Sequence, residues 1–522
     1  MASWAVLDRN NTIAPPGYNR WLIPPAALAV HLCIGQVYAT SVYKTSLIKD
    51  FGTTQTAIGI IFSIAIVMLG LSAAIGGTWV ERSGPRKAMF ASACFWAVGF
   101  GVAALGIATT QLWLVYLGYG VIGGIGLGIG YISPVSTLIK WFPDRPGLAT
   151  GMAIMGFGGG ALFASPAQRQ LLSFFDSSYH SADSTSTADG GALTSLFITL
   201  GIIYFLIMMV GVWNIRVPAD DWKPAGFDPA TVKTKALVTT DNVSAANAIR
   251  TPQFWLLWVV LFCNVTAGIG ILEQASPMIQ DFFRSGIGST SSVAAAAAGG
   301  FVGVLSLFNM AGRFLWSSAS DRIGRKPIYL LYLGGGIVLY VLLALAGNTA
   351  TALFVLIAAL ILSFYGGGFA TAPAYLRDLF GVFQVGAIHG RLLTAWSLAG
   401  VAGPLIINSF LDAQGKPGTL TAAAYRPALF TMIGILAVGF VANLLIRPVA
   451  ARFHEATAAA PKNADRQPKR APAAGSDSVA ATDTPSGGSA SSARVIFSWG
   501  LVIAMLVYGV VQTAITAAKL FG

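Results

Sequence analysis

The stretch GTWVERSGPRK, residues 77–87, returns later in the chain as SSASDRIGRK, residues 317–326. Each copy places an acid, Glu81 or Asp321, beside an arginine and continues with glycine and further basic residues. The two acids stand 240 residues apart. A polar loop that recurs at this distance indicates that the chain contains two copies of one structural unit.

Two pairs of prolines repeat at nearly the same distance. Pro134 and Pro373 are 239 residues apart, and Pro166 and Pro404 are 238 residues apart. Three landmarks at one offset predict two halves of six helices each, related by an axis along the membrane normal. We expect a central cavity between the halves at mid-membrane depth.

The composition predicts a chain that is surrounded mainly by lipid. Of its 522 residues, 55% are hydrophobic and 10% are charged, whereas soluble proteins carry about 25% charged residues. Polar clusters separate apolar runs of roughly 20 residues, the length that crosses a hydrocarbon core of about 30 Å. We predict an all-α membrane protein with the spans 21–45, 55–80, 88–107, 111–139, 147–172, 192–214, 253–279, 292–317, 328–347, 351–375, 386–410, 424–446 and 494–516.

The polar segments divide the chain further. Residues 448–493 are rich in Ala, Pro, Ser and Asp, so we predict a disordered linker there. The last span has no counterpart in the repeat. The predicted segments are a cytoplasmic N-terminal segment (1–20), a first half (21–214), a cytoplasmic central loop (215–251), a second half (252–447), a cytoplasmic linker (448–493) and a thirteenth membrane helix (494–516).

The net charge of +12 is a signal of topology. Most of the Lys and Arg residues fall in loops on one side of the predicted spans, which is the usual cytoplasmic bias of membrane proteins. We therefore expect an inner (plasma) membrane protein with a cytoplasmic N-terminus, a periplasmic C-terminus, no nucleic-acid partner and no cleaved leader. Cys33, Cys94 and Cys263 have neither metal-ligand nor disulfide spacing and are interpreted as small hydrophobic residues.

The repeated loops suit a gate. Their acids can cap the end of a neighbouring helix and pair across the two halves, and such contacts close one face of the protein. Alternatively, the loops only orient the chain in the membrane. The predicted gating residues are Glu81, Arg82, Arg86, Asp321, Arg322 and Arg325.

Arg313 is the best candidate for a substrate-binding residue. A charge at the centre of a membrane helix costs about 2.5–3.5 kcal/mol on insertion scales and is usually functional. Asn309 lies one turn away on the same face. Because a guanidinium binds a carboxylate with two hydrogen bonds, the pair predicts an organic anion as the substrate. The alternative is a structural pair between Arg313 and the carboxylates at the helix end.

Two further ionisable residues are weaker candidates. Lys44, near the outer end of its span, is a second anion contact or a charge that responds to protonation, unless it only reaches the interface. Glu273 is a possible carrier of a coupling proton, or else an interfacial carboxylate. His31 is interpreted as an ordinary helix histidine, and His389 and Arg391 are expected at the cytoplasmic mouth of the span 386–410.

Aromatic and amide side chains could surround the anion, although each alone would more often be packing. The predicted lining residues are Gln36, Tyr38, Tyr131, Tyr365, Phe369 and Trp396. The glycines between 118 and 130 lack the strand and the Lys-Ser/Thr of a phosphate loop, so they indicate close helix packing. The spans contain no catalytic or metal-binding constellation, so we predict neither an enzyme nor a cofactor.

These stretches resemble a known family. The two loops resemble the signature of the major facilitator superfamily, with Glu81 in place of its usual Asp. Residues 123–160 and 389–404 look like the oxalate/formate antiporter family within it. The resemblance covers about residues 20–446 and implies the twelve-helix major facilitator fold, with one extra helix, and alternating-access transport of small carboxylates.

The resemblance also implies site residues. Arg313 matches the arginine on the eighth helix of the oxalate transporter, but Trp396 stands where that family has a lysine. The related monocarboxylate transporters pair the arginine with a lysine on the first helix, which Lys44 matches, and have an acid where Asn309 stands here.

Three functions follow from the sequence. The first is secondary transport of a monocarboxylate, such as formate, lactate or pyruvate, by proton symport or anion exchange, in a monomer surrounded by lipid. The alternatives are oxalate/formate exchange and a membrane receptor that senses a carboxylate.

Overall fold

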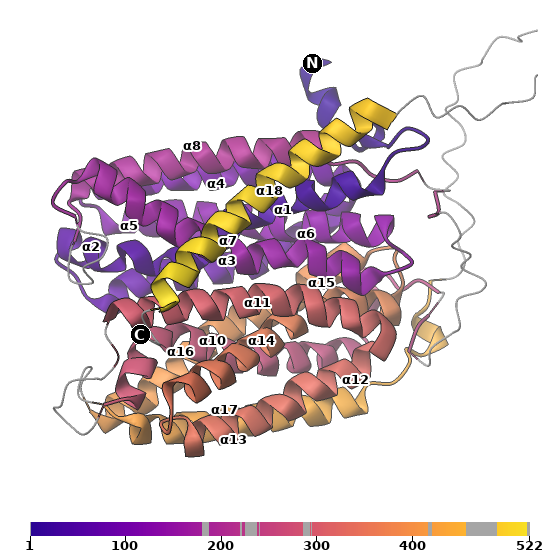
Figure 1. Cartoon of the computed structure of the whole chain (residues 1–522). Coiled ribbons are helices and arrows are strands. Elements are labelled where there is room, and N and C mark those ends of the chain that lie inside the picture. Colours follow the sequence, from indigo (N-terminus) through magenta and orange to yellow (C-terminus); the bar gives the residue numbers. More distant parts are fainter. Residues whose placement is uncertain are drawn as a thin grey trace, which may run out of the picture.

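The computed structural model is a bundle of long helices (Figure 1). In the part of the chain that it describes, twelve helices are long and apolar enough to cross a membrane. The helix α11 (Ala295–Ile323) is not among these twelve, although its 29 residues lie within the bundle. With α11 the bundle has the thirteen predicted helices. The structure describes residues 2–179, 187–219, 222–224, 237–239, 241–284, 293, 295–415, 420–455 and 488–518.

The first six predicted spans correspond to eight helical segments. They are α1 (Ile23–Gly35), α2 (Ser41–Phe51), α3 (Gln55–Ser83), α4 (Pro85–Ala108), α5 (Leu112–Val115), α6 (Gly124–Trp141), α7 (Pro146–Phe175) and α8 (Gly190–Asn214). A π-helical stretch, Tyr116–Gly123, joins α5 to α6.

The second group begins with a short helix and ends with the extra one. It comprises α9 (Ala245–Ala248), α10 (Pro252–Phe282), α11, α12 (Arg325–Leu330), α13 (Gly336–Ala346), α14 (Thr351–Phe380), α15 (Val385–Leu392), α16 (Thr394–Gln414), α17 (Ala422–Leu445) and α18 (Gly488–Ala517). Most of the predicted linker 448–493, and part of the central loop 215–251, lie outside the described residues.

Apart from α18, the two groups of helices form separate layers, purple and orange in Figure 1. They meet where α7 packs on α11 and α14, and where α3 packs on α15 and α16. Glycines allow close helix contacts, as the sequence predicted. A Cβ atom at Gly124 would lie 2.9 Å from the carbonyl oxygen of Ala65, so α6 approaches the backbone of α3.

Two predicted spans are interrupted. The span 21–45 divides into α1, a 3-10 turn (Gln36–Ala39) and α2. The span 386–410 breaks at Leu393, between α15 and α16.

The extra helix α18 crosses the other helices obliquely (Figure 1). It contacts α1 and α7 in the first group and α11 in the second. Val502 and Met505 pack against Leu28 and Leu32 of α1. The indole nitrogen of Trp499 donates a hydrogen bond of 3.0 Å to the carbonyl oxygen of Trp21. The extra helix is therefore docked on both layers.

Candidate functional site: a buried arginine between two anchored helix ends

The glycine of each repeated loop produces the same sharp turn. Gly84 has φ 86° and ends α3, and Gly324 has φ 100° and ends α11. Glycine adopts such positive φ angles without the steric cost of a side chain. Each turn leaves an acid, Glu81 or Asp321, on the last turn of its helix. We call the end of the bundle that carries these two acids the basic end.

Asp321 binds the first turn of α7. Its Oδ1 accepts a hydrogen bond from the backbone N–H of Gly147 at 2.8 Å, and its Oδ2 accepts one from Leu148 at 2.9 Å. The first N–H groups of a helix lack partners within the helix and carry partial positive charge, so a carboxylate stabilises them. This contact joins the two layers, and we call it the Asp321 anchor.

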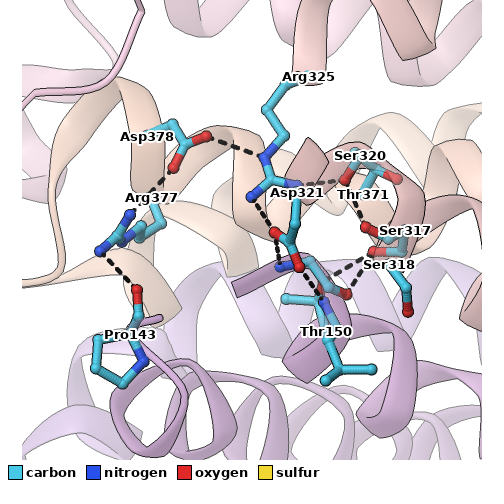
Figure 2. Close-up of polar contacts among 12 residues, drawn as sticks. Pro143, Thr150, Ser317, Ser318, Ser320, Asp321, Arg325, Thr371, Arg377 and Asp378 are labelled. Carbon is cyan, nitrogen blue, oxygen red and sulfur yellow. Dashed lines mark hydrogen bonds and ion pairs between the residues drawn. The ribbon is translucent and has the colours of Figure 1, made fainter. Parts of the chain in front are cut away.

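A buried arginine supports the Asp321 anchor (Figure 2). Arg325 lies 2.7 Å from Asp321 and 2.9 Å from Asp378, and its side chain is 7% exposed. It also donates a hydrogen bond to Ser320. Arg377 contacts Asp378 at 3.3 Å and reaches the carbonyl oxygen of Pro143 in the first layer at 3.4 Å. The Asp321 anchor is therefore part of a chain of ion pairs.

Glu81 makes the corresponding contact from the first layer. It accepts a hydrogen bond of 3.2 Å from the backbone N–H of Gly386, in the first turn of α15. Lys140 on α6 forms an ion pair of 2.7 Å with the other carboxylate oxygen. We call this contact the Glu81 anchor. The capping that the sequence predicted is thus present in both copies.

The other predicted gating residues lie elsewhere. Arg86 is buried within the first layer, where it donates hydrogen bonds to the carbonyl oxygens of Val6, Val212, Trp213 and Ile215. Arg82 and Arg322 are exposed. In the contacts described above, Glu81, Asp321 and Arg325 form the two anchors, and the gating role of all six residues stays a prediction.

Arg313 is fully buried on α11. Its Nε donates a hydrogen bond of 3.0 Å to the side-chain oxygen of Asn309, and its Nη1 donates one of 3.4 Å to the carbonyl oxygen of Ile154. Glycine makes room for it, because a Cβ atom at Gly158 would lie 2.9 Å from Nε. The predicted pair with a helix-end carboxylate is absent among the described residues, because Asp321 binds Arg325 instead.

Aromatic rings from both layers surround this guanidinium. Its central carbon lies 5.8 Å from the ring centroid of Phe157, 5.9 Å from that of Tyr365 and 5.1 Å from that of Phe369. A cation at such a distance is attracted by the negative face of a ring. These contacts hold a buried charge without a carboxylate partner.

Three more rings complete the enclosure. Tyr131 contacts Phe157, Phe369 and Trp396 at centroid distances of 5.5–5.7 Å. The hydroxyls of Tyr38 and Tyr365 lie 3.2 Å apart and join the two layers. We call the set the aromatic cage, and its members are Tyr38, Tyr131, Phe157, Tyr365, Phe369 and Trp396.

Three hydrogen-bond donors in this region have no acceptor among the described residues. They are Nη2 of Arg313, the hydroxyl of Tyr131 and the indole N–H of Trp396, and all three atoms are buried. A buried donor without an acceptor costs about 1–3 kcal/mol. A carboxylate offers two oxygens that accept up to about four hydrogen bonds. The cage is therefore chemically suited to a small anion.

Five of the six predicted lining residues belong to the cage, and Gln36 does not. Its amide donates to Tyr119 at 2.8 Å and accepts from Gln168 at 3.3 Å, so it belongs to a network within the first layer. Phe157 was missed by the sequence analysis. It lies in the glycine-rich stretch 156–160, where nothing distinguished it from a packing residue.

The weaker ionisable candidates lie away from the cage. Lys44 is half-buried on α2, beyond the break in the first span. Glu273 is exposed on α10, within hydrogen-bonding distance of Asn408 at 3.4 Å. In the part of the chain that the structure describes, neither of them contacts Arg313, and their roles stay predictions.

His389 lies in the second turn of α15, its side chain is 1% exposed, and its ring centroid lies 5.8 Å from that of Tyr131. Its expected place at the cytoplasmic mouth of the span stays a prediction. His31 contacts the same tyrosine at 5.3 Å and makes a hydrogen bond of 3.1 Å with its carbonyl oxygen. Arg391 is partly exposed and donates a hydrogen bond to the carbonyl oxygen of Ala245.

Known carboxylate carriers are among the relatives of this chain. The oxalate:formate antiporter of Oxalobacter formigenes is 25% identical over 386 residues, which cover 74% of this chain and 83% of that protein. The apicoplast pyruvate carrier 1 of Toxoplasma gondii is 25% identical over 394 residues, which cover 69% of this chain and 70% of that protein.

The fold also matches a solved structure. A major facilitator superfamily transporter, FucP, in the outward conformation, superposes with a TM-score of 0.58 at 14% identity. The match covers 82% of this chain and 99% of the other.

The sequence model of the Major Facilitator Superfamily matches residues 26–404 and, in a second match, 304–521. With its duplicated helices and its paired loops, this chain belongs to the major facilitator superfamily.

Proposed function

We propose that this protein is a secondary active transporter of small monocarboxylates, such as formate, lactate or pyruvate. The observation that carries this proposal is the buried Arg313 in its aromatic cage, where its Nη2, the Tyr131 hydroxyl and the Trp396 indole N–H have no acceptor among the described residues. Since relatives are named for oxalate, formate and pyruvate, a carboxylate is the anion class that fits.

The number of charges favours a monocarboxylate. One guanidinium balances one carboxylate, whereas a dianion would leave a second negative charge in an environment from which water is largely excluded. Trp396 occupies the position at which a second cation was expected for oxalate, and its ring packs 4.5 Å from that of Phe369. Small apolar groups of a monocarboxylate fit against such rings.

The two anchors supply a mechanism for alternating access. Both anchors lie at the basic end. There Asp321 of the second layer holds the first turn of α7, and Glu81 of the first layer holds the first turn of α15. We infer that these contacts keep the basic end closed and separate when the layers rock apart. The hydrogen bond between Tyr38 and Tyr365 closes the cage in the same conformation.

The orientation follows from the charge distribution. We infer that the basic end is cytoplasmic, that the N-terminus is cytoplasmic and the C-terminus periplasmic, and that the protein acts as a monomer in the inner membrane. The transporting halves are residues 21–214 and 252–447. In this view coupling is by proton symport or by anion exchange.

Exchange of oxalate for formate is the second candidate, because a relative with that name covers most of the chain. Reconstituted protein distinguishes the two. Proteoliposomes preloaded with formate, lactate or oxalate should take up labelled monocarboxylate much faster than labelled oxalate. A strong preference for oxalate would refute the monocarboxylate proposal.

Replacement of the central cation tests the binding site. We expect Arg313→Ala to reduce exchange at least about 10-fold, because a charged hydrogen-bond partner contributes about 1.5–3 kcal/mol and its loss leaves the anion unbalanced. Arg452→Ala, at an exposed site outside the spans, is the matched control and should transport normally. Unchanged exchange by Arg313→Ala would exclude this site.

A further inference from the structure

His389 occupies a distinctive position between the cage and the Glu81 anchor. It lies one turn after Gly386, whose N–H is held by Glu81, and seven residues before Trp396 of the cage. Seven residues are about two helical turns, or about 10 Å. The imidazole therefore lies on the line between the substrate site and the basic end.

Both ring nitrogens of His389 are buried without a hydrogen-bond partner among the described residues. Most buried polar atoms are hydrogen-bonded, so such an exception calls for an explanation. His31, on the other side of Tyr131, has one nitrogen committed to the carbonyl oxygen of that tyrosine. His389 is thus the freer of two imidazoles that flank one ring of the cage.

The charged groups near His389 are mostly paired with one another. On α3, Glu81 is paired with Lys140 of α6. On α14, Asp378 is paired with Arg325. Arg391 follows His389 on α15 itself, and His31 of α1 acts on His389 electrostatically. The other ionisable side chains on the elements packed against α15 are Arg82 on α3, Tyr131 on α6, Tyr365, Tyr375 and Arg377 on α14, and Asp412 near the far end of α16; α9 carries none.

We propose that His389 carries the coupling proton and makes the protein a proton–monocarboxylate symporter. This inference rests on the proposed function, since it requires a carboxylate on Arg313. Without the anion, the positive charge of Arg313 disfavours a second cation in the same low-dielectric region. With the anion bound, that charge is balanced and His389 can take up one proton.

The coupling is reciprocal. If a bound anion favours the proton on His389, the proton favours the anion to the same extent. One proton and one carboxylate then cross together, so that the cycle moves no net charge and the membrane potential does not oppose uptake. When the Glu81 anchor opens, the imidazole comes into reach of water at the basic end and releases its proton there.

Proton movement tests this directly. Proteoliposomes that contain wild-type protein and a trapped pH-sensitive dye should acidify inside when a monocarboxylate enters, with one proton per anion. An acidic outer medium should drive its accumulation above equilibrium. For His389→Asn we expect carboxylate exchange to continue, while the acidification and the accumulation are lost. His454→Asn, outside the spans and paired with Asp241, should behave as wild type.

The outcomes separate the two proposals. If the wild type exchanges carboxylates without moving protons, or if His389→Asn still accumulates them, the coupling role is wrong and the carboxylate site stands. If the wild type transports no carboxylate, the proposed function fails and the coupling role with it. If His389→Asn loses carboxylate exchange as well, the decision rests on His389→Gln and on proton uptake by the wild type. Proton-coupled transport by the Gln variant would overturn the proposal.

Discussion

The two anchors are copies of one device, but they are built with different strength. Asp321 uses both carboxylate oxygens on consecutive N–H groups at 2.8 and 2.9 Å. Glu81 receives one N–H at 3.2 Å. Arg325 behind Asp321 is 7% exposed, whereas Lys140 beside Glu81 is 29% exposed. Because solvent weakens an ion pair, we expect the Asp321 anchor to contribute more to the closure proposed for the basic end.

This asymmetry shows what a duplication preserves. Both copies keep the acid, the turn glycine and a helix end as the partner, since these create the contact itself. The supporting cation differs, because Lys140 comes from α6 of the same layer, while Arg325 follows Asp321 in the loop and is held by Asp378. We expect the basic end to open first at the Glu81 anchor.

Asp321→Asn should have the largest effect on closure. The amide keeps the shape but loses the negative charge that faces the helix end and Arg325, and charge-assisted hydrogen bonds contribute about 1.5–3 kcal/mol. We expect the basic end to open at least about 10-fold more often. Alkylation of a cysteine at Thr150, buried beside Ser317, measures this in a chain that lacks its three native cysteines.

If the cysteine at position 150 were alkylated in Asp321→Asn at the same rate as in the parent chain, the proposed difference between the two anchors would be contradicted. A parallel measurement of total helix content by circular dichroism distinguishes opening from unfolding.

Glu81→Gln should have a smaller effect. It removes one partly exposed ion pair and weakens a single helix-end hydrogen bond, so a change of about 0.5–1 kcal/mol is expected. The same alkylation assay should show an increase of about 2- to 5-fold. A larger increase than in Asp321→Asn would reverse the proposed order of the two anchors.

Arg82→Ala should have the smallest effect. Its side chain is exposed, and an exposed charge contributes little to closure. We expect the alkylation rate and the rate of carboxylate exchange to stay close to those of the parent chain. A loss of transport comparable to that of Asp321→Asn would give Arg82 a gating role that its contacts do not suggest.

The sequence predicted the fold and the two anchors because both leave local patterns. Apolar runs mark the spans, and the repeated loops place Glu81 and Asp321 at equivalent helix ends. Arg313 was also recognisable, since a cation within an apolar span is costly and therefore conspicuous. Such signals depend on the residue and its immediate neighbours.

The remaining features depend on contacts between distant helices. Phe157 belongs to the cage and His389 lies beside Tyr131 because α7 and α15 pack against the other layer, and no local pattern gives that depth or direction. Gln36 was expected in the cage but is bonded to Tyr119 within its own layer, a partner 83 residues away that no local pattern indicates.

Binding of a labelled or unlabelled monocarboxylate to the purified protein is the most direct test of the central claim. Isothermal titration with lactate, formate and pyruvate should reveal one anion per chain for at least one of them, with weaker binding of oxalate. The account predicts that Arg313→Ala abolishes this binding while Arg452→Ala preserves it. Binding by Arg313→Ala with unchanged affinity and stoichiometry would contradict a carboxylate site at Arg313.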